Sequence, residues 1–216
     1  MQNIYFLIIV VCLIPLISAQ AQKVTWQQTN GPYFGKVNSL CTNDTGAVIA
    51  ATATGIFIST NSGTTWNQSF LTLEQNVLFT SLALAPNGFI FAGAVGGGIY
   101  VSSNQGSNWE QRSPSSSAIY SITTTASGTV LAGAVAAGAF RSTDNGLTWS
   151  NVLWVSSLDI FALAYSQNGY VFAGGGDEWS KVGKGIFRSS DDGLTWVSAN
   201  VGLSSLFVRT IAIDSS

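Results

Sequence analysis

The chain has 216 residues, of which only 8% are charged, and it carries 8 Lys and Arg, 10 Asp and Glu and no His. Eight cations cannot form a dense phosphate-neutralising surface, so the composition argues against a nucleic-acid-binding protein. The lack of His excludes Ser-His-Asp and Cys-His catalysis and most zinc sites, and the 46% of hydrophobic residues excludes a disordered chain.

The first segment of the chain has the pattern of an export signal. Residues 4–17 are almost wholly apolar, a run shorter than the roughly 20 residues that a membrane span needs. Ala19-Gln20-Ala21 follows, which resembles a signal-peptidase cleavage site. We therefore expect residues 1–21 to be a signal peptide and the protein to be secreted, periplasmic or on the cell surface. Membrane contact is expected only through this signal, with an uncleaved anchor as the alternative.

The remainder of the chain repeats itself four times. Each copy contains Ser-x-Asn/Asp-x-Gly-x-x-Trp, and the copies occupy residues 59–66, 102–109, 142–149 and 189–196. A second feature keeps step with the first, because a glycine closes a short turn and precedes an apolar run in every copy. These turn glycines are Gly46, Gly88, Gly128 and Gly169. Two features in register predict one structural unit that is repeated along the chain.

Each repeat is predicted to contain four strands. In the second copy the first three strands cover 81–85, 89–94 and 98–101, and the fourth begins at Trp109. The turn glycine allows a tight hairpin because glycine tolerates positive φ. The second strand is apolar at consecutive positions, which indicates burial on both faces. A four-stranded unit of this length, covered on both sides, predicts an all-β propeller blade.

The repeats define the expected domain organisation. The propeller is predicted to span residues 22–216, with full repeats at about 38–68, 80–111, 120–151 and 161–198. A fifth repeat is expected to begin at 208–216, and residues 24–29 around Trp26 are expected to be a lone closing strand. We therefore expect an incomplete ring, either the N-terminal part of a longer protein or an open arc with an exposed edge.

The Trp motif resembles the Asp-box, or BNR repeat, of sialidases, sortilin-type receptors, some xyloglucan hydrolases and photosystem assembly factors. Asp144 and Asp191 match this motif fully, whereas Asn61 and Asn104 stand in the Asp position. The resemblance implies a hairpin between strands three and four, with a structural role away from the ligand face. The residues concerned are Asn61, Gly63, Trp66, Asn104, Gly106, Trp109, Asp144, Gly146, Trp149, Asp191, Gly193 and Trp196.

The resemblance does not carry over a catalytic set. Sialidases of this kind use an arginine cluster and an Arg-Ile-Pro motif, but this chain has four arginines, two of them at one repeat position, and no such motif. Related xyloglucan hydrolases use two carboxylic acids. No pair stands out among the loop acids Glu74, Glu110, Asp159, Asp177 and Glu178. We expect no catalytic residue, cofactor or metal, with a glycoside hydrolase completed outside this chain as the alternative.

The loops suggest a binding face instead. In a propeller, the links between strands two and three and between consecutive blades share the face opposite the Asp-boxes. The longest of these links, 174–184, holds Asp177, Glu178 and Trp179, and Trp154 lies in another. These four residues are the candidate ligand contacts. The alternatives are a solvated insertion whose Trp179 packs on the blade, and a Trp154 that plugs a blade junction. We expect an exported, non-catalytic propeller that binds a glycan, a peptide or a protein partner.

Overall fold

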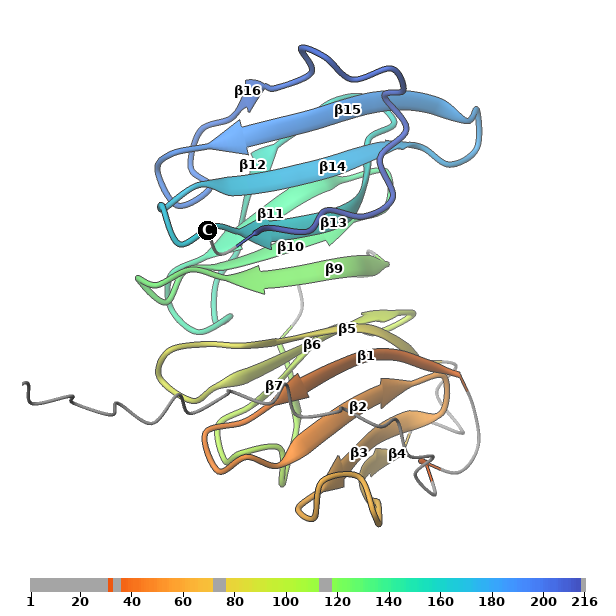
Figure 1. Ribbon diagram of the computed structural model, residues 1–216, viewed down its shortest axis with the longest axis vertical. Coiled ribbons are helices and arrows are strands. Elements are labelled where there is room, and N and C mark those ends of the chain that lie inside the picture. The colour runs from red at the N-terminus through yellow and green to blue at the C-terminus, as the bar shows by residue number, and fades with distance from the viewer. Residues whose placement is uncertain (1–30, 33–35, 72–76, 113–117, 215–216) are drawn as a thin grey trace, which may run out of the picture.

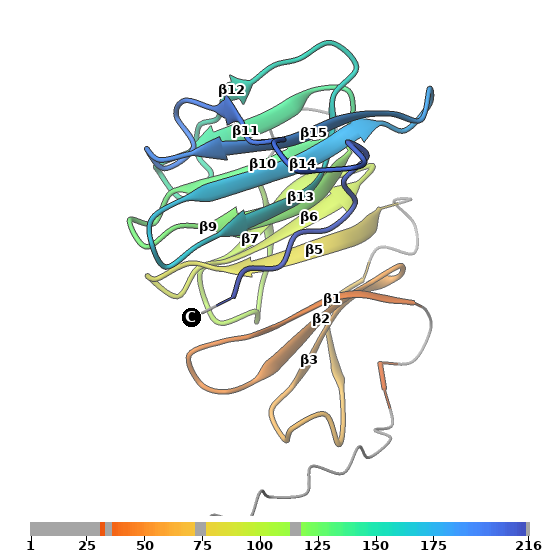
Figure 2. The same ribbon diagram turned by 45° about the horizontal axis from the view of Figure 1, so that its top comes forward.

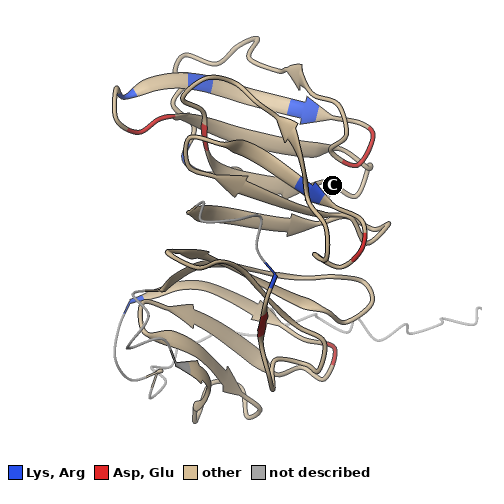
Figure 3. Ribbon diagram, turned by 180° about the vertical axis from the view of Figure 1, so that it is seen from behind, with Lys and Arg blue, Asp and Glu red and all other residues tan. Residues whose placement is uncertain are grey.

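The computed structural model describes residues 31–32, 36–71, 77–112 and 118–214. The predicted signal peptide and the predicted lone strand at 24–29 lie outside these residues. Within the described part the ordered elements are strands, and no apolar helix is long enough to cross a bilayer. Figure 3 shows that long stretches of every blade contain no charged residue, in keeping with the low charge of the sequence.

The strands form four antiparallel sheets of four, each built from one continuous segment (Figure 1). The first sheet contains β1 (Val37–Thr42), β2 (Val48–Thr52), β3 (Gly55–Ser59) and β4 (Asn67–Leu71). The second contains β5 (Leu78–Leu84), β6 (Ile90–Val95), β7 (Gly98–Ser102) and β8 (Glu110–Gln111). The third contains β9 (Ile119–Thr124), β10 (Val130–Ala134), β11 (Gly138–Ser142) and β12 (Ser150–Leu153). The fourth contains β13 (Asp159–Tyr165), β14 (Val171–Asp177), β15 (Val182–Ser189) and β16 (Val197–Ser198). This arrangement is an incomplete propeller of four blades, as the repeats predicted.

The hydrophobic core lies between neighbouring blades. One cluster joins buried residues of blades one and two, including Ile49 and Phe79, and another joins blades two and three through Phe91 and Ile119. Every residue of β10 is buried, and β2 and β6 are buried at all but one position. The prediction that the second strand has no wet face is therefore confirmed.

In blades two and three, a glycine in the second strand lets the blade approach the next one, whereas β2 of blade one has Ala51 at this position. A Cβ added to Gly93 would lie 2.6 Å from Cγ2 of Ile119, and one added to Gly133 would lie 2.4 Å from Cγ2 of Ile160. The isoleucine of the next blade fills the space that a side chain would need. Close packing of neighbouring blades therefore depends on the absence of a side chain at these positions.

The first strand of each blade carries a one-residue bulge. The register of β1 passes from Val37 to Ser39 while its partner β2 advances by one, so Asn38 has no partner in the ladder. Thr80, Tyr120 and Phe161 are bypassed in the same way in β5, β9 and β13. Bulges re-aim side chains and are frequent beside binding sites. We call Asn38, Thr80, Tyr120 and Phe161 the bulge row.

The four Trp-motif segments form hairpins with one shared hydrogen-bond pattern; we call these segments, 59–66, 102–109, 142–149 and 189–196, the motif hairpins. In the third, Ser142 Oγ accepts a bond of 2.9 Å from the N–H of Gly146, and Asp144 Oδ1 accepts one of 2.9 Å from the N–H of Thr148. Asn61 and Asn104 accept the corresponding N–H bond at 2.9 Å with a neutral amide oxygen. Asp and Asn therefore both close this turn.

The two aspartates of the motif hairpins make stability depend on pH. Hydrogen bonds from the Thr148 hydroxyl and N–H lower the pKa of Asp144 to about 2, and Thr195 has the same effect on Asp191. A carboxyl whose pKa is lowered on folding stabilises the fold above its ordinary pKa of 3.8, and this contribution is lost as the pH falls towards 2.

We therefore expect the free energy of unfolding to fall less between pH 4 and pH 2 in the double variant D144N/D191N than in the original chain. The effect is modest, below about 1 kcal/mol per site, because Asp191 is exposed and Asp144 is only half-buried, so water screens both carboxylates. Urea unfolding at a series of pH values measures it. Equal pH dependence of the two proteins would contradict the assignment.

After β16 the chain returns across the free face of the fourth blade, the face turned away from blade three, and runs beside β13 and β14 (Figures 1 and 2). A Cβ added to Gly174 would lie 2.6 Å from Cγ1 of Val208, so Val208 has the position on blade four that Ile119 and Ile160 have on blades two and three. Residues 203–214 are nevertheless not assigned to a strand. The start of a fifth repeat at 208–216 therefore stays a prediction.

Candidate functional site

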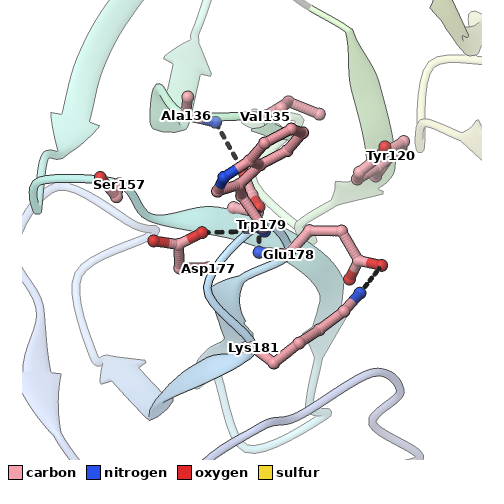
Figure 4. Close-up of a pocket in the computed structure, with 9 residues that line it drawn as sticks. Tyr120, Val135, Ala136, Ser157, Asp177, Glu178, Trp179 and Lys181 are labelled. Atoms are coloured by element: carbon pink, nitrogen blue, oxygen red, sulfur yellow. Dashed lines mark hydrogen bonds and ion pairs between the residues drawn. The ribbon is translucent and has the colours of Figure 1, made fainter.

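A hollow of about 770 Å³ lies between blades three and four, at the strand ends opposite the motif hairpins. Blade three provides the link after β10, and blade four provides the first residue of β13 and the link between β14 and β15. Figure 4 shows the side chains around the hollow, with the Asp177 and Glu178 carboxylates pointing to different sides of their loop. The lining residues are Tyr120, Val135, Ala136, Ser157, Asp159, Asp177, Glu178, Trp179 and Lys181.

The link between β14 and β15 is shaped by Asp177. Its Oδ1 accepts hydrogen bonds of 2.9 Å from the N–H of Trp179 and 3.0 Å from the N–H of Ser180. The bond from Ser180 is the main reason why the pKa of Asp177 lies below its ordinary value. The turn ends at Lys181, whose φ of 59° lies in the left-handed region. Asp177 therefore organises the loop that presents Trp179 and Lys181.

Asp159 ties the two walls of the hollow together. Its side chain is buried, with Oδ1 accepting a bond of 2.6 Å from the N–H of Ala136 and Oδ2 one of 2.8 Å from the N–H of Glu178. Ala136 belongs to blade three and Glu178 to blade four, so one carboxylate fixes the links of two blades. Charge-assisted bonds of this kind are among the stronger ones in proteins.

Glu178 holds two cations at the edge of the hollow. Its Oε1 lies 2.6 Å from Nζ of Lys181, and its Oε2 lies 2.6 Å from Nη2 of Arg209. The hydrogen bonds from Lys181 and Arg209 lower the pKa of Glu178, and the bond from Lys181 has the largest effect. The Arg209 guanidinium lies over Phe161, 4.9 Å from the ring centroid, and Phe161 stacks on Tyr120 with centroids 5.8 Å apart. Two residues of the bulge row thus connect Arg209 to the wall of the hollow.

The structure brings together three of the four predicted ligand contacts. Asp177, Glu178 and Trp179 all line the hollow, and Trp179 is 96% exposed, so its side chain does not pack on the blade. Trp154 is 67% exposed and does not line the hollow, so it neither joins these contacts nor plugs a blade junction.

The motif hairpins lie at the other ends of the strands, away from the hollow. Their tryptophans instead pack at blade junctions: Trp109, Trp149 and Trp196 each contact a buried cluster, while the glycine of the same hairpin faces strand two of the preceding blade. A Cβ added to Gly193, for example, would lie 2.5 Å from Leu131. None of the motif residues contributes to the hollow.

Sequence reasoning did not identify Tyr120 and Arg209, and it placed Asp159 only among the loop acids. The sequence does contain a signal for two of them. Tyr120 and Arg209 occupy the same position in their repeats, directly before Ser121 and Thr210. This position varies in chemistry from repeat to repeat while its neighbours stay similar. Such variation within a repeat is what a binding surface on a fixed scaffold produces.

The carboxylates of the hollow are already engaged by the protein. Asp159 accepts two N–H bonds, Asp177 accepts two, and Glu178 pairs with two cations. A general acid in glycoside hydrolysis needs a carboxyl whose pKa is raised, so that it is protonated at working pH. The pKa values of Asp177 and Glu178 are instead lowered. Asp177 and Glu178 therefore do not have the raised pKa that a general acid requires.

Neither the protein-family models nor the curated proteins yield a match to this chain. Solved structures do match. An ancestral GH74 enzyme superposes with a TM-score of 0.70 at 21% identity, over 84% of this chain and 28% of the enzyme. The extracellular domain of a one-component system from B. thetaiotaomicron gives a TM-score of 0.67 at 15% identity, over 87% of this chain and 26% of that one.

A smaller propeller also matches. YCF48 from Cyanidioschyzon merolae has a TM-score of 0.61 at 13% identity, over 81% of this chain and 59% of YCF48. YCF48 bound to D1 peptide has a TM-score of 0.57 at 20% identity. The chain thus spans less than a third of the length of the GH74 enzyme and of the extracellular domain. At these identities the likeness concerns the fold alone, and that fold is the β-propeller.

Proposed function

We propose that this chain is an exported, non-catalytic propeller module that binds a ligand in the hollow between blades three and four. The observation that carries the proposal is the contrast among the lining residues. The carboxylates are occupied by protein donors, whereas Trp179 beside them is 96% exposed. Exposed aromatic rings next to fixed polar groups are common anchors in binding sites.

The proposal agrees with the repeat pattern. Residues of the motif hairpins are engaged with one another and with blade junctions, which supports a structural role for them as Asp-boxes. The hollow lies at the opposite strand ends, where the predicted ligand loop is found. Export is proposed from the apolar segment and the Ala-x-Ala sequence at residues 4–21. A scaffold that holds rigid strands and varies its links is well suited to recognition.

Replacing Trp179 by Ala is expected to weaken ligand binding about tenfold, because the variant loses the exposed aromatic face. A screen of glycans and peptides against the full chain identifies binders, and calorimetry then compares the original chain with W179A. Trp154→Ala is the matched control, since Trp154 is also exposed but lies outside the hollow. Both variants should keep the original melting temperature within a few degrees.

Two outcomes would count against the proposed function. Equal loss of affinity in W179A and W154A would remove the hollow as the binding site. Release of fluorophore from fluorogenic glycosides by the full chain, abolished in D177N or E178Q, would instead identify a glycoside hydrolase.

A further inference from the structure

The two cations on Glu178 are poorly explained by stability. The Lys181, Arg209 and Glu178 side chains are 65%, 57% and 37% exposed. Ion pairs in contact with water contribute little to folding, because solvent screens the charges and the long side chains lose entropy. The convergence of two cations on one carboxylate beside a hollow therefore points towards binding.

Arg209 is held in place before any ligand arrives. Its guanidinium lies 4.9 Å from the centroid of Phe161 and 5.1 Å from that of Phe207, and Glu178 accepts a bond of 2.6 Å from it. A guanidinium fixed against aromatic rings loses less entropy when it binds an anion than a free one does. Its planar fork also matches the two oxygens of a carboxylate.

We propose that Arg209 and Lys181 form an anion-binding pair that takes the carboxylate of an acidic saccharide, and that Glu178 occupies this position when no ligand is bound. The inference rests on the proposed function, because the saccharide would lie in the same hollow. The Glu178 carboxylate shows the geometry, with one oxygen on the ammonium group and the other on the guanidinium. A ligand carboxylate competes with Glu178 for these donors.

The walls of the hollow favour a saccharide over a peptide. A peptide that binds as an added strand needs free backbone donors on its receptor. Here the N–H groups of Ala136 and Glu178 are bonded to Asp159, and those of Trp179 and Ser180 to Asp177. What the hollow offers instead is aromatic surface and charged side chains. Aromatic faces suit the C–H faces of sugar rings, and the cation pair suits a uronic acid.

The test uses calorimetry on the full chain with three probes: a tetramer of galacturonic acid, the same tetramer as its methyl ester, and tetraglutamate. We expect the acid to bind at least about tenfold more tightly than the ester, since esterification removes the charge that the cations recognise. Tetraglutamate should bind more weakly than the acid. Arg209→Gln should weaken binding of the acid about tenfold, and Arg209→Lys should give a smaller loss.

Glu178→Gln separates this inference from a merely structural role. Removing the competing carboxylate should raise the affinity for the galacturonate tetramer severalfold, whereas a structural ion pair would give a loss. Arg188→Gln is the matched control, because Arg188 lies 4.9 Å over the Tyr170 ring in the same stacking geometry but at the motif-hairpin end of blade four. The affinity of the R188Q variant for the galacturonate tetramer should equal that of the original chain.

The inference is overturned if R209Q binds the acid as well as the original chain does, if the ester binds equally well, or if tetraglutamate binds more tightly. It is also overturned if none of the probes binds. A neutral saccharide that loses affinity in W179A but not in R209Q would leave the proposed function standing and remove the anion-binding pair alone.

Discussion

Replacing Gly133 by Ala is expected to lower the free energy of unfolding by about 3 kcal/mol, although only one methyl group is added. The new Cβ would lie 2.4 Å from Cγ2, 2.8 Å from Cβ and 2.9 Å from the carbonyl oxygen of Ile160. Two of these three atoms, Cβ and the carbonyl oxygen of Ile160, are fixed by the backbone of the next blade and cannot rotate away. Relief therefore requires blades three and four to separate, which exposes buried surface on both.

Urea unfolding of G133A measures the loss, and two further variants identify its cause. Gly128→Ala should cost only about 1–2 kcal/mol, because Gly128 has open space around it and only its positive φ of 85° resists a side chain. In an Ile160→Ala background, G133A should cost less than it does alone, since the nearest contact has been removed. A G133A protein as stable as the original chain would show that the blades are not packed on this glycine.

Replacing Asp159 by Ala is expected to cost about 3 kcal/mol as well, by a different route. The substitution leaves the N–H groups of Ala136 and Glu178 without the acceptors that they have at 2.6 and 2.8 Å. Loss of a partner from a buried donor costs about 1–3 kcal/mol, and the half-buried Glu178 should contribute more of the loss than the exposed Ala136, whose N–H can bond to water. Because the two donors belong to different blades, the variant should also loosen the hollow and weaken binding there.

Asp159→Asn tests the geometry of this bridge. An amide has one acceptor oxygen and turns its NH₂ group towards the second donor, so D159N should lie between the original chain and D159A in stability. Hydrogen exchange gives a local measurement, with faster exchange expected at the amides of Ala136 and Glu178 in both variants. Unchanged protection of these two amides would contradict the role of Asp159.

The repeat pattern was sufficient to predict the four sheets because each blade is specified locally. The turn glycines and the Trp motif define two hairpins per repeat, and β4 and β8 begin one residue after Trp66 and Trp109. The bulges could not be predicted in the same way. The second repeat was expected to start its first strand at Ser81, directly after the bulged Thr80. A bulge depends on register between two strands, which the apolar pattern of one strand does not contain.

The candidate site was predictable only in part, for a related reason. The unusual length of the 174–184 link drew attention to Asp177, Glu178 and Trp179. The role of Asp159 depends on two backbone donors in different blades, and backbone donors leave no mark on the sequence. Trp154 was predicted on the same ground as Trp179, an aromatic residue in a link, yet it lies outside the hollow. The sequence of a link does not show which part of the surface its aromatic residue faces.

The bulge row has a consequence for how such a protein can change over evolution. A bulged residue has no ladder partner, whereas the residues on either side of it pack and pair in every blade. Its identity differs among Asn, Thr, Tyr and Phe in the four blades, and so do its contacts across the junction: Asn38 and Thr80 donate to a carbonyl of the next blade, whereas Tyr120 and Phe161 stack on each other. A lineage built on this scaffold can therefore change its surface at one position per repeat while the strand register is kept, provided that the new side chain also makes a contact with the next blade.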